Sequence, residues 1–215
     1  MPHPSDPRLL VLHGLRLKGV AGEDAVTDAT GLPAGQVADL LAGLAEQGLA
    51  THRDGALAGW SLTPAGRAEN TRLVGAEVEE AGARPVVRGA YGRFRALNAP
   101  VLDVCSRWQV REVAGTPVLN DHADPSYDAE VVSDLAAIQD RAEPLLDDLA
   151  GALDRYRAYG PRLRHAVERV EAGDGAWFTK PLMPSYHTVW FELHQDLLTT
   201  LGLERASESE AASAP

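Results

Sequence analysis

The chain has 215 residues, of which 45% are hydrophobic, enough to form the core of one large or two small domains. No apolar run approaches the roughly 20 residues of a membrane-spanning helix, and the first residues lack the basic and apolar regions of a secretory signal. The single cysteine, Cys105, excludes an intramolecular disulfide and suits a reducing compartment. We therefore expect a cytoplasmic protein with no membrane segment, and its richness in Ala, Gly and Arg with little Lys suggests a bacterial source.

The net charge of −11 is unusual for a protein that binds nucleic acid, which normally carries a basic patch. Residues 1–72 hold eight acidic and six basic side chains, a net of −2. The remaining 143 residues hold 23 acidic and 14 basic side chains, a net of −9. The charge therefore weakens the expectation of DNA binding without excluding it.

The first predicted helix follows a short tail. Residues 1–7 contain three prolines and no periodicity, so we expect them to be disordered. Residues 8–18 place leucines on one helical face, with Arg16 and Lys18 pointing to solvent. His13 lies among these leucines, so we interpret it as a half-buried packing residue and not as a ligand.

The next stretch reads as two helices, a hairpin and a third helix. A short helix over 22–30 ends at Gly31, and a second helix over 33–47 has apolar residues on one face. Residues 49–53 and 56–62 are predicted strands joined by a tight turn. A further helix starts at Thr63 and runs to about Gly82. The order predicts a winged helix-turn-helix, three helices plus a β-hairpin wing, as a domain over 8–83.

A resemblance supports this prediction. The segment GLPAGQVADLLAGLAEQGLATHRDGALAGWSLTPAGRA, residues 31–68, resembles the DNA-binding core of MarR-type winged-helix regulators, most closely from Leu62 to Ala68. The resemblance covers about the first third of the chain. It implies a homodimeric transcriptional regulator that binds a two-fold site on double-stranded DNA. Winged helices also serve as protein-docking modules, so that alternative stays open.

The exposed face of the second motif helix is where bases would be read. Gln36 could recognise adenine, because an amide donates and accepts at the matching positions of that base. The helix has no Lys or Arg, and Asp39 and Glu46 would be repelled by phosphates. Phosphate contacts would therefore come from flanking residues, for which the candidates are Thr27, Thr30, Arg53 and Arg67.

A break at 83–85 separates this domain from a predicted all-α helical bundle over 84–204. Residues 86–112 are predicted as one or two helices around a break at 98–100, with Cys105 in the core. Residues 113–128 are predicted as a loop. Its residues 120–124 include carboxylates and a histidine, but their spacing matches no metal loop, so we expect turns and no metal.

Two further helical regions follow. Residues 129–156 form the clearest long helix, with a kink or restart at Pro144 and an end at residues 160–161. After a shorter helix, residues 176–201 concentrate aromatic side chains and are helical from Ser185 onward. This cluster could line a ligand pocket, form a dimer interface or fill the core. The candidate ligand-binding or interface residues are Arg107, Trp108, Trp177, Tyr186, His187 and Trp190.

The second domain carries a fainter resemblance. The segments NDHADPSYDA, residues 120–129, and GDGAWFTKPLMPSYHTVWFELHQDLLTTLG, residues 173–202, resemble a helical domain of actinobacterial winged-helix proteins. The resemblance implies a link to phosphoenolpyruvate/pyruvate dikinase-type proteins, and it carries over no catalytic residue. Residues 205–215 are of low complexity and are expected to be disordered.

These observations predict a mainly α-helical regulator that dimerises and senses a small-molecule effector through its second domain. The alternative is a winged-helix docking module or enzyme-accessory protein that binds no DNA. We expect no cofactor and no enzymatic activity, because no phosphate-binding glycine loop, zinc-spaced Cys/His set or nucleophile with its base is visible in the sequence.

Overall fold

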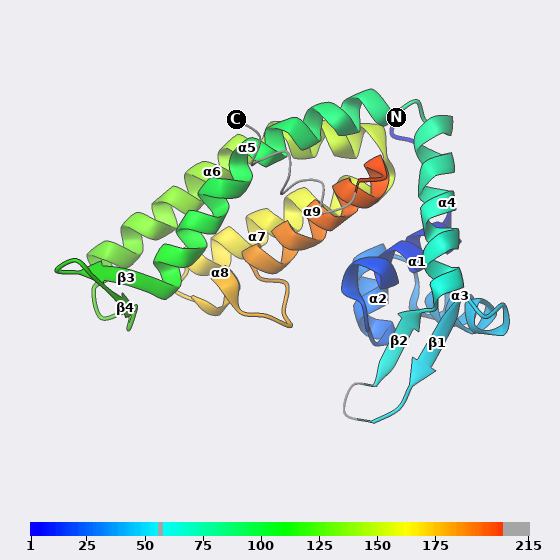
Figure 1. The fold of residues 1–215 in the computed structure, drawn as a ribbon, viewed down its shortest axis with the longest axis horizontal. Helices are drawn as coiled ribbons and strands as arrows, with labels where there is room; N and C mark the ends of the chain where they lie inside the picture. Colours follow the sequence, from blue (N-terminus) through cyan, green and yellow to red (C-terminus); the bar gives the residue numbers. More distant parts are fainter. Residues whose placement is uncertain (56–57, 204–215) are drawn as a thin grey trace. The chain divides into compact units, whose positions relative to one another are not determined.

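The computed structural model describes residues 1–55 and 58–203, and within these ranges the chain is mainly helical (Figure 1). It divides into two compact units. The N-terminal unit comprises residues 1–87 together with residues 151–155 and 195–203. The helical unit comprises residues 88–150 and 156–194. No described helix is long and apolar enough to cross a membrane.

Four helices and one hairpin build the first part of the N-terminal unit. Asp6 caps the first helix, because its Oδ1 accepts hydrogen bonds from the backbone N–H groups of Arg8 and Leu9. Gly31 ends the second helix in the left-handed conformation. The elements are α1 (Pro7–Lys18), α2 (Glu23–Thr30), α3 (Ala34–Glu46), β1 (Ala50–Arg53), β2 (Gly59–Leu62) and α4 (Pro64–Glu80).

The predicted apolar faces meet in one core. Val37, Leu41 and Leu44 of α3 are buried, which confirms the helical spacing, whereas Leu40 is only half-buried. They pack with residues of α1, α2 and the hairpin: Val11, Leu12, Leu15, Val26, Ala50 and Leu62. The hairpin is antiparallel, with Ala50 opposite Leu62 and Arg53 opposite Gly59. Helices α2 and α3 and the β1–β2 hairpin therefore pack against α1.

The start of α4 is fixed against the end of α3 by close backbone packing. Thr63 caps α4 by accepting from the N–H of Gly66, and its hydroxyl lies 2.7 Å from the carbonyl oxygen of Gly48. A Cβ on Gly66 would lie 1.9 Å from the carbonyl oxygen of Leu49. Only glycine fits at this point, which gives a physical reason for the glycine in the segment Leu62–Ala68.

The prediction that residues 1–7 are disordered is wrong. The backbone of His3 pairs with the far segment of the unit, through 3.0 Å hydrogen bonds from its N–H to Ala152 and from the N–H of Asp154 to its carbonyl. Ser5 donates to the carboxylate of Glu77, and α1 already begins at Pro7. These bonds hold the N-terminal residues in place.

The helical unit is an antiparallel bundle of long helices (Figure 1). Arg93 and Arg107 of α5 pair with Asp148 and Asp134 of α6, so these helices run in opposite directions. Phe94 of α5 stacks on Trp190 of α9 at 4.4 Å between ring centroids. The elements are α5 (Arg84–Gln109), β3 (Val110–Val113), β4 (Thr116–Leu119), α6 (Pro125–Ala152), η1 (Asp154–Ala158), α7 (Tyr159–Glu171), α8 (Ala176–Thr179) and α9 (Tyr186–Leu201).

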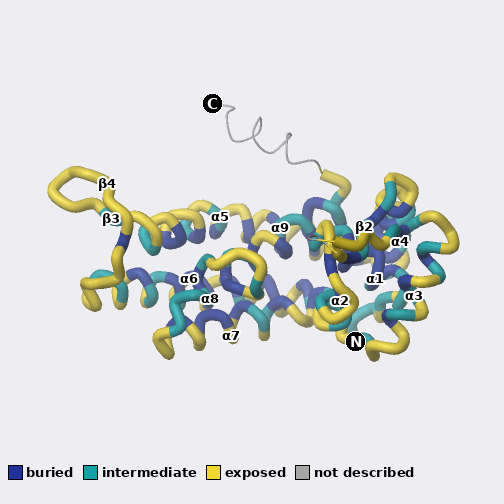
Figure 2. The backbone as a smooth tube through the Cα atoms, turned by 90° about the horizontal axis from the view of Figure 1, so that it is seen from below, coloured by how far each residue is buried: buried dark blue, intermediate teal, exposed yellow. Residues whose placement is uncertain are grey.

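The second region is not all-α, contrary to the prediction. Residues 110–119, expected to end a helix and begin a loop, form an antiparallel hairpin in which Val110 pairs with Leu119. Ala114 and Gly115 have φ angles of 50° and 79°, the left-handed pair that closes a two-residue hairpin turn. Figure 2 shows the hairpin as almost entirely exposed.

Two predicted helix boundaries are also wrong, and of the two alternatives at Pro144 the restart is absent. Helix α5 continues through Pro100 because Leu97, Val101 and Val104 on its inner face are buried, and this packing outweighs one missing hydrogen bond. Helix α6 likewise runs through Pro144 without a restart. Residues 160–161 lie in the first turn of α7, where proline is tolerated, and the long helix ends earlier, at Ala152.

The later segments 151–155 and 195–203 pack into the N-terminal unit, which a boundary at residues 83–84 does not anticipate. Helices α6 and α9 therefore begin in one unit and end in the other. The predicted disordered tail, 205–215, lies outside the described residues.

Candidate functional site

The surface formed by α2, α3 and the β1–β2 hairpin contains the residues predicted to contact DNA. Gln36 is exposed on α3, as are Asp39 and Glu46, while the opposite face is buried. The exposed face of α3 thus offers one amide able to read a base, two carboxylates and no cation.

The two predicted threonine donors are placed unfavourably. The Thr30 hydroxyl donates to the carbonyl of Val26 at 2.9 Å and lies 3.3 Å from the N–H of Leu32, so it stabilises the end of α2. The Thr27 hydroxyl is buried and has no partner among the described residues. Neither hydroxyl is presented to a ligand on the surface.

The two predicted arginines are exposed. Arg53 ends β1 and Arg67 lies in the first turn of α4. Neither guanidinium has an ion-pair partner within residues 1–55 and 58–203, so both remain available for phosphate. His52, next to Arg53, packs edge-on against Trp60 at 5.1 Å between ring centroids and stiffens the hairpin.

This surface carries a net negative charge. Residues 23–62, from α2 to the end of the hairpin, contain six carboxylates and one arginine. Five of the carboxylates lie on α2 and α3, all of them exposed: Glu23, Asp24, Asp28, Asp39 and Glu46. A polyanion approaching α3 would meet net repulsion from these groups.

The aromatic cluster predicted as a pocket, interface or core is mainly core. Tyr186 and Trp190 are 0% and 2% exposed, and the Trp190 indole N–H donates to the Asn98 side chain at 3.1 Å. Burial raises the pKa of the Tyr186 hydroxyl well above its ordinary value. Of the alternatives predicted for these two side chains, their burial therefore favours core over an exposed interface.

Two other candidates of this cluster are half-buried. Trp177 packs edge-on against His165 and under the guanidinium of Arg169, which lies 5.6 Å from its ring. His187 lies in the first turn of α9. These two side chains do not form a common site.

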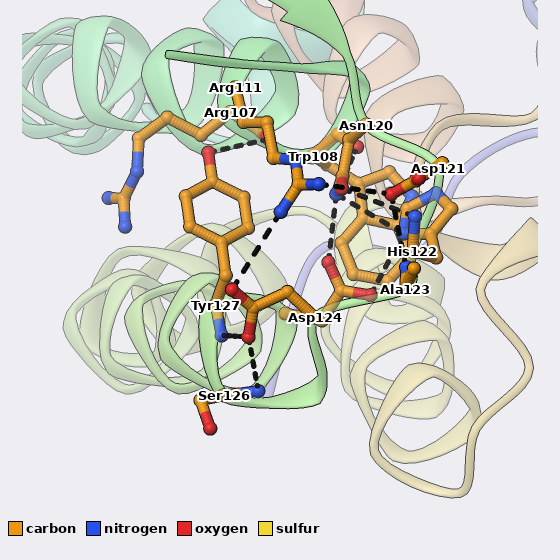
Figure 3. A network of polar contacts seen from close by, with 11 residues as sticks. Arg107, Trp108, Arg111, Asn120, Asp121, His122, Ala123, Asp124, Ser126 and Tyr127 are labelled. Atoms are coloured by element: carbon orange, nitrogen blue, oxygen red, sulfur yellow. Dashed lines mark hydrogen bonds and ion pairs between the residues drawn. The ribbon is translucent and has the colours of Figure 1, made fainter. Parts of the chain in front are cut away.

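Trp108 and Arg107 belong to a polar network at the end of α5 (Figure 3). Trp108 stacks on Phe178 at 4.7 Å and contacts the tilted ring of His122 at 4.4 Å between ring centroids. The Arg107 guanidinium donates to Asp134 at 2.7 Å, and this hydrogen bond raises the arginine pKa. The Tyr127 hydroxyl donates to the Arg107 carbonyl at 3.0 Å. Arg107 is thus half-exposed at the surface of the bundle, and its guanidinium is already paired with carboxylates of α5 and α6.

The loop predicted as turns, residues 120–124, completes the network in Figure 3. The Asn120 amide donates to Asp128 at 2.8 Å and to the Trp108 carbonyl at 3.2 Å. His122 has a φ of 57°, and its Nδ1 lies 2.9 Å from the other oxygen of Asp128. A carboxylate oriented on an imidazole is one part of an acid–base pair, but no described serine, cysteine or threonine is bonded to this histidine. The geometry therefore caps α6 and orders the loop.

No group of three His, Cys, Asp or Glu side chains in the described ranges could hold a metal ion. Cys105 is buried, and this burial raises its pKa to about 12, which removes it as a nucleophile at neutral pH.

Sequence reasoning missed a buried charge cluster in the N-terminal unit. His13, expected to be a half-buried packing residue, is buried, and its Nε2 lies 3.0 Å from a carboxylate oxygen of Asp196. Arg155 donates to the same carboxylate and to Glu77. The partners lie far apart in the sequence, so no local spacing identifies them; only the isolated polar residue on an apolar helix face gave a signal.

Comparison with known proteins gave no relatives from which to argue: no protein-family model matches the chain, and no curated protein or solved structure matches it significantly.

Proposed function

We propose that the N-terminal unit is a winged helix and that the protein is a regulator that binds double-stranded DNA through it. The observation that supports this most is the order α2, α3, hairpin, α4 mounted on α1, with the outer face of α3 and the tip-side residue Arg53 both exposed. In this proposal α3 enters the major groove and β1–β2 is the wing.

The three predicted contacts with exposed side chains have defined roles in the proposal, and Thr27 and Thr30 have none. Gln36 reads an adenine edge from the first turn of α3, and Arg53 and Arg67 contact phosphates on either side. Two arginines per head give little affinity for DNA, because the carboxylates of α2 and α3 repel the phosphates. The proposal therefore includes a homodimer that places two heads on a two-fold site, with an effector or partner altering their spacing.

The test is binding of the purified protein to its own upstream DNA across a range of salt concentrations. Four phosphate contacts from two heads predict a slope of log K against log salt of about −4, because each neutralised phosphate contributes about −0.9. Arg53→Ala in both heads should lower the slope magnitude by about 2. Arg84→Ala, which removes an exposed arginine paired with Glu79 at 2.8 Å, is the matched control and should leave binding unchanged.

The acidic surface favours a second candidate function, a docking module for a basic protein surface. Asp39 and Glu46 would then be contact residues instead of obstacles. The fainter resemblance of the second region points to an enzyme of phosphoenolpyruvate/pyruvate metabolism as the class of partner. In this function the protein acts as an enzyme accessory and binds no DNA.

One variant separates the two functions. Asp39→Asn with Glu46→Gln removes two negative charges from the face of α3 while keeping its shape. Under the regulator proposal this variant binds DNA more tightly, because repulsion of the phosphates is reduced. Under the docking proposal it still binds no DNA and loses a stoichiometric protein partner that copurifies with the unchanged chain.

A further inference from the structure

We infer that the binding surface of the N-terminal unit is controlled by a buried charge cluster. The cluster is completed by Arg155 of η1, directly after α6, and by residues at the end of α9. The cluster consists of His13, Glu77, Arg155, Asp196 and Thr200. All five residues belong to the N-terminal unit, although Arg155, Asp196 and Thr200 arrive from the second half of the chain.

The guanidinium of Arg155 joins three segments at once. Its Nε donates to Glu77 Oε2 on α4 at 2.7 Å. One terminal nitrogen donates to Asp196 of α9, and the other donates to the Thr200 hydroxyl of α9 at 2.6 Å. A planar guanidinium holds such partners in fixed directions, so the three segments are locked in one arrangement.

The first helix enters the same cluster through His13. Its Nε2 lies 3.0 Å from Asp196 Oδ1, and its other ring nitrogen lies 3.4 Å from the amide nitrogen of Asn70 on α4. His13 stands between Leu12 and Leu15, which pack against α2 and α3 in the core. Helix α1 thus contacts the core that supports α3 on one side and the charge cluster on the other.

The side chains of the cluster are shielded from solvent, and this makes the cluster sensitive to the loss of one member. The side chains of Arg155, Glu77, Asp196 and His13 are at most 5% exposed. Burial alone would raise the pKa of Asp196, but Arg155 and His13 outweigh it and hold this pKa well below its ordinary value. Removing one partner leaves a buried charge without compensation, so the arrangement is kept complete or opens as a whole.

The end of α6 is fixed to the unit by its backbone as well. The hydrogen bonds of His3 with Ala152 and Asp154 pin the residues directly before Arg155. The chain reaches Arg155 from α6 through residues 153–154, and Asp196 lies on α9 itself, so in this inference a ligand-induced change in α6 or α9 acts on the cluster through these residues. The surface proposed to bind DNA or a protein is then competent only while the cluster is closed.

Hydrogen exchange on the full chain tests this control without assuming any partner. Arg155→Met opens the cluster, and Thr200→Val removes only the hydroxyl. We expect Arg155→Met to speed exchange in α1, α3, α4 and 195–201 by about tenfold or more relative to α7, with the same pattern at smaller amplitude in Thr200→Val. Arg84→Met, which breaks an exposed ion pair of the same unit, should change none of these segments.

Two results would overturn the inference. One is unchanged exchange in α1 and α3 in both cluster variants; the other is an equal increase in every helix, α7 included, which would mean a general loss of stability. If Arg155→Met does not fold, Thr200→Val decides alone. The inference rests on the proposed function only for what the surface binds, so failure to bind DNA leaves the exchange result standing and tests the proposed function separately.

Discussion

The two units differ in how they accommodate charged side chains. In the N-terminal unit, four ionisable side chains are buried together and bonded to one another around Arg155. In the helical unit most ion pairs lie near the surface, such as Arg93 with Asp148, which are 45% and 55% exposed; a pair with a buried carboxylate, Arg162 with Glu192, keeps its arginine 25% exposed. Its interior is mainly apolar and aromatic, and the amide of Gln139 and the hydroxyl of Tyr186 are buried there without a partner among the described residues.

This difference indicates what each unit is built to tolerate. A buried ionic cluster specifies one arrangement and fails when one member is lost. An aromatic core gains its stability from contact area and loses it gradually as groups are removed. The N-terminal unit should therefore respond to single changes abruptly, and the helical unit gradually.

The largest effect should come from the backbone contact between α4 and Leu49. Gly66→Ala would destabilise the N-terminal unit by about 3 kcal/mol or more, because the new Cβ would overlap backbone atoms that cannot move independently. Gly75→Ala in the same helix is the control, since its Cβ would meet nothing within 4 Å; it should stabilise the unit by about 1 kcal/mol. Urea denaturation measures both, and equal stabilities would contradict the packing described here.

Acid should distinguish the buried cluster from a surface pair. The pKa of Asp196 is lowered on folding, so its ionic stabilisation is complete above its ordinary value of 3.8 and is lost as pH falls toward the folded value. The stability difference between the unchanged chain and Asp196→Asn should be constant at pH 5 to 7 and shrink below about pH 4. Asp174, whose pKa Arg169 lowers at the surface, provides the control variant Asp174→Asn, which should show a much smaller difference. A constant Asp196 difference down to pH 2 would contradict this.

In the helical unit, removing a buried polar group should stabilise instead of destabilise. Gln139 is 3% exposed, and neither atom of its amide has a partner among the described residues. Gln139→Leu should therefore raise the free energy of unfolding by about 1–3 kcal/mol, the usual cost of an unsatisfied buried group. Gln109→Leu, at an exposed position of α5, should change it by less than about 0.5 kcal/mol. A loss of stability in Gln139→Leu would show that the amide is bonded in solution.

The smallest effect concerns reactivity and not stability. Because burial raises the pKa of Cys105 to about 12, the native thiol should react with a thiol reagent at pH 8 only as fast as the bundle opens. Denatured protein should react within the mixing time, which provides the control. Rapid labelling of the folded chain would mean that the core of the helical unit opens more readily than its packing indicates.

The sequence was informative wherever local rules decide the structure. The apolar spacing of α3 and the proline at the start of α4 both predicted elements that the structure contains. The hairpin was also predicted, but β2 begins at Gly59 and not at residue 56, directly after Asp54–Gly55, and residues 56–57 lie outside the described ranges. Long helices were also visible from their periodicity. These features depend on residues within about one or two turns of each other, which a single sequence displays directly.

Errors arose where packing overrides a local signal. Pro100 and Pro144 suggested breaks, but both helices continue because their inner faces are buried. The β3–β4 hairpin was missed although β-branched residues flank Ala114 and Gly115, because the stretch was interpreted as loop. The charge cluster and the anchoring of His3 depend on partners that lie 41 or more residues apart, which one sequence does not pair.

The distance in sequence between these partners also determines when the charge cluster can form during synthesis. At about 5–20 residues per second, Asp196 leaves the ribosome about 10 to 40 s after His13. Until residue 196 has been made, the N-terminal unit carries His13 and Glu77 without the full set of arginine and aspartate that pairs with them. If the cluster controls the surface as inferred, the surface becomes competent only after that point of synthesis.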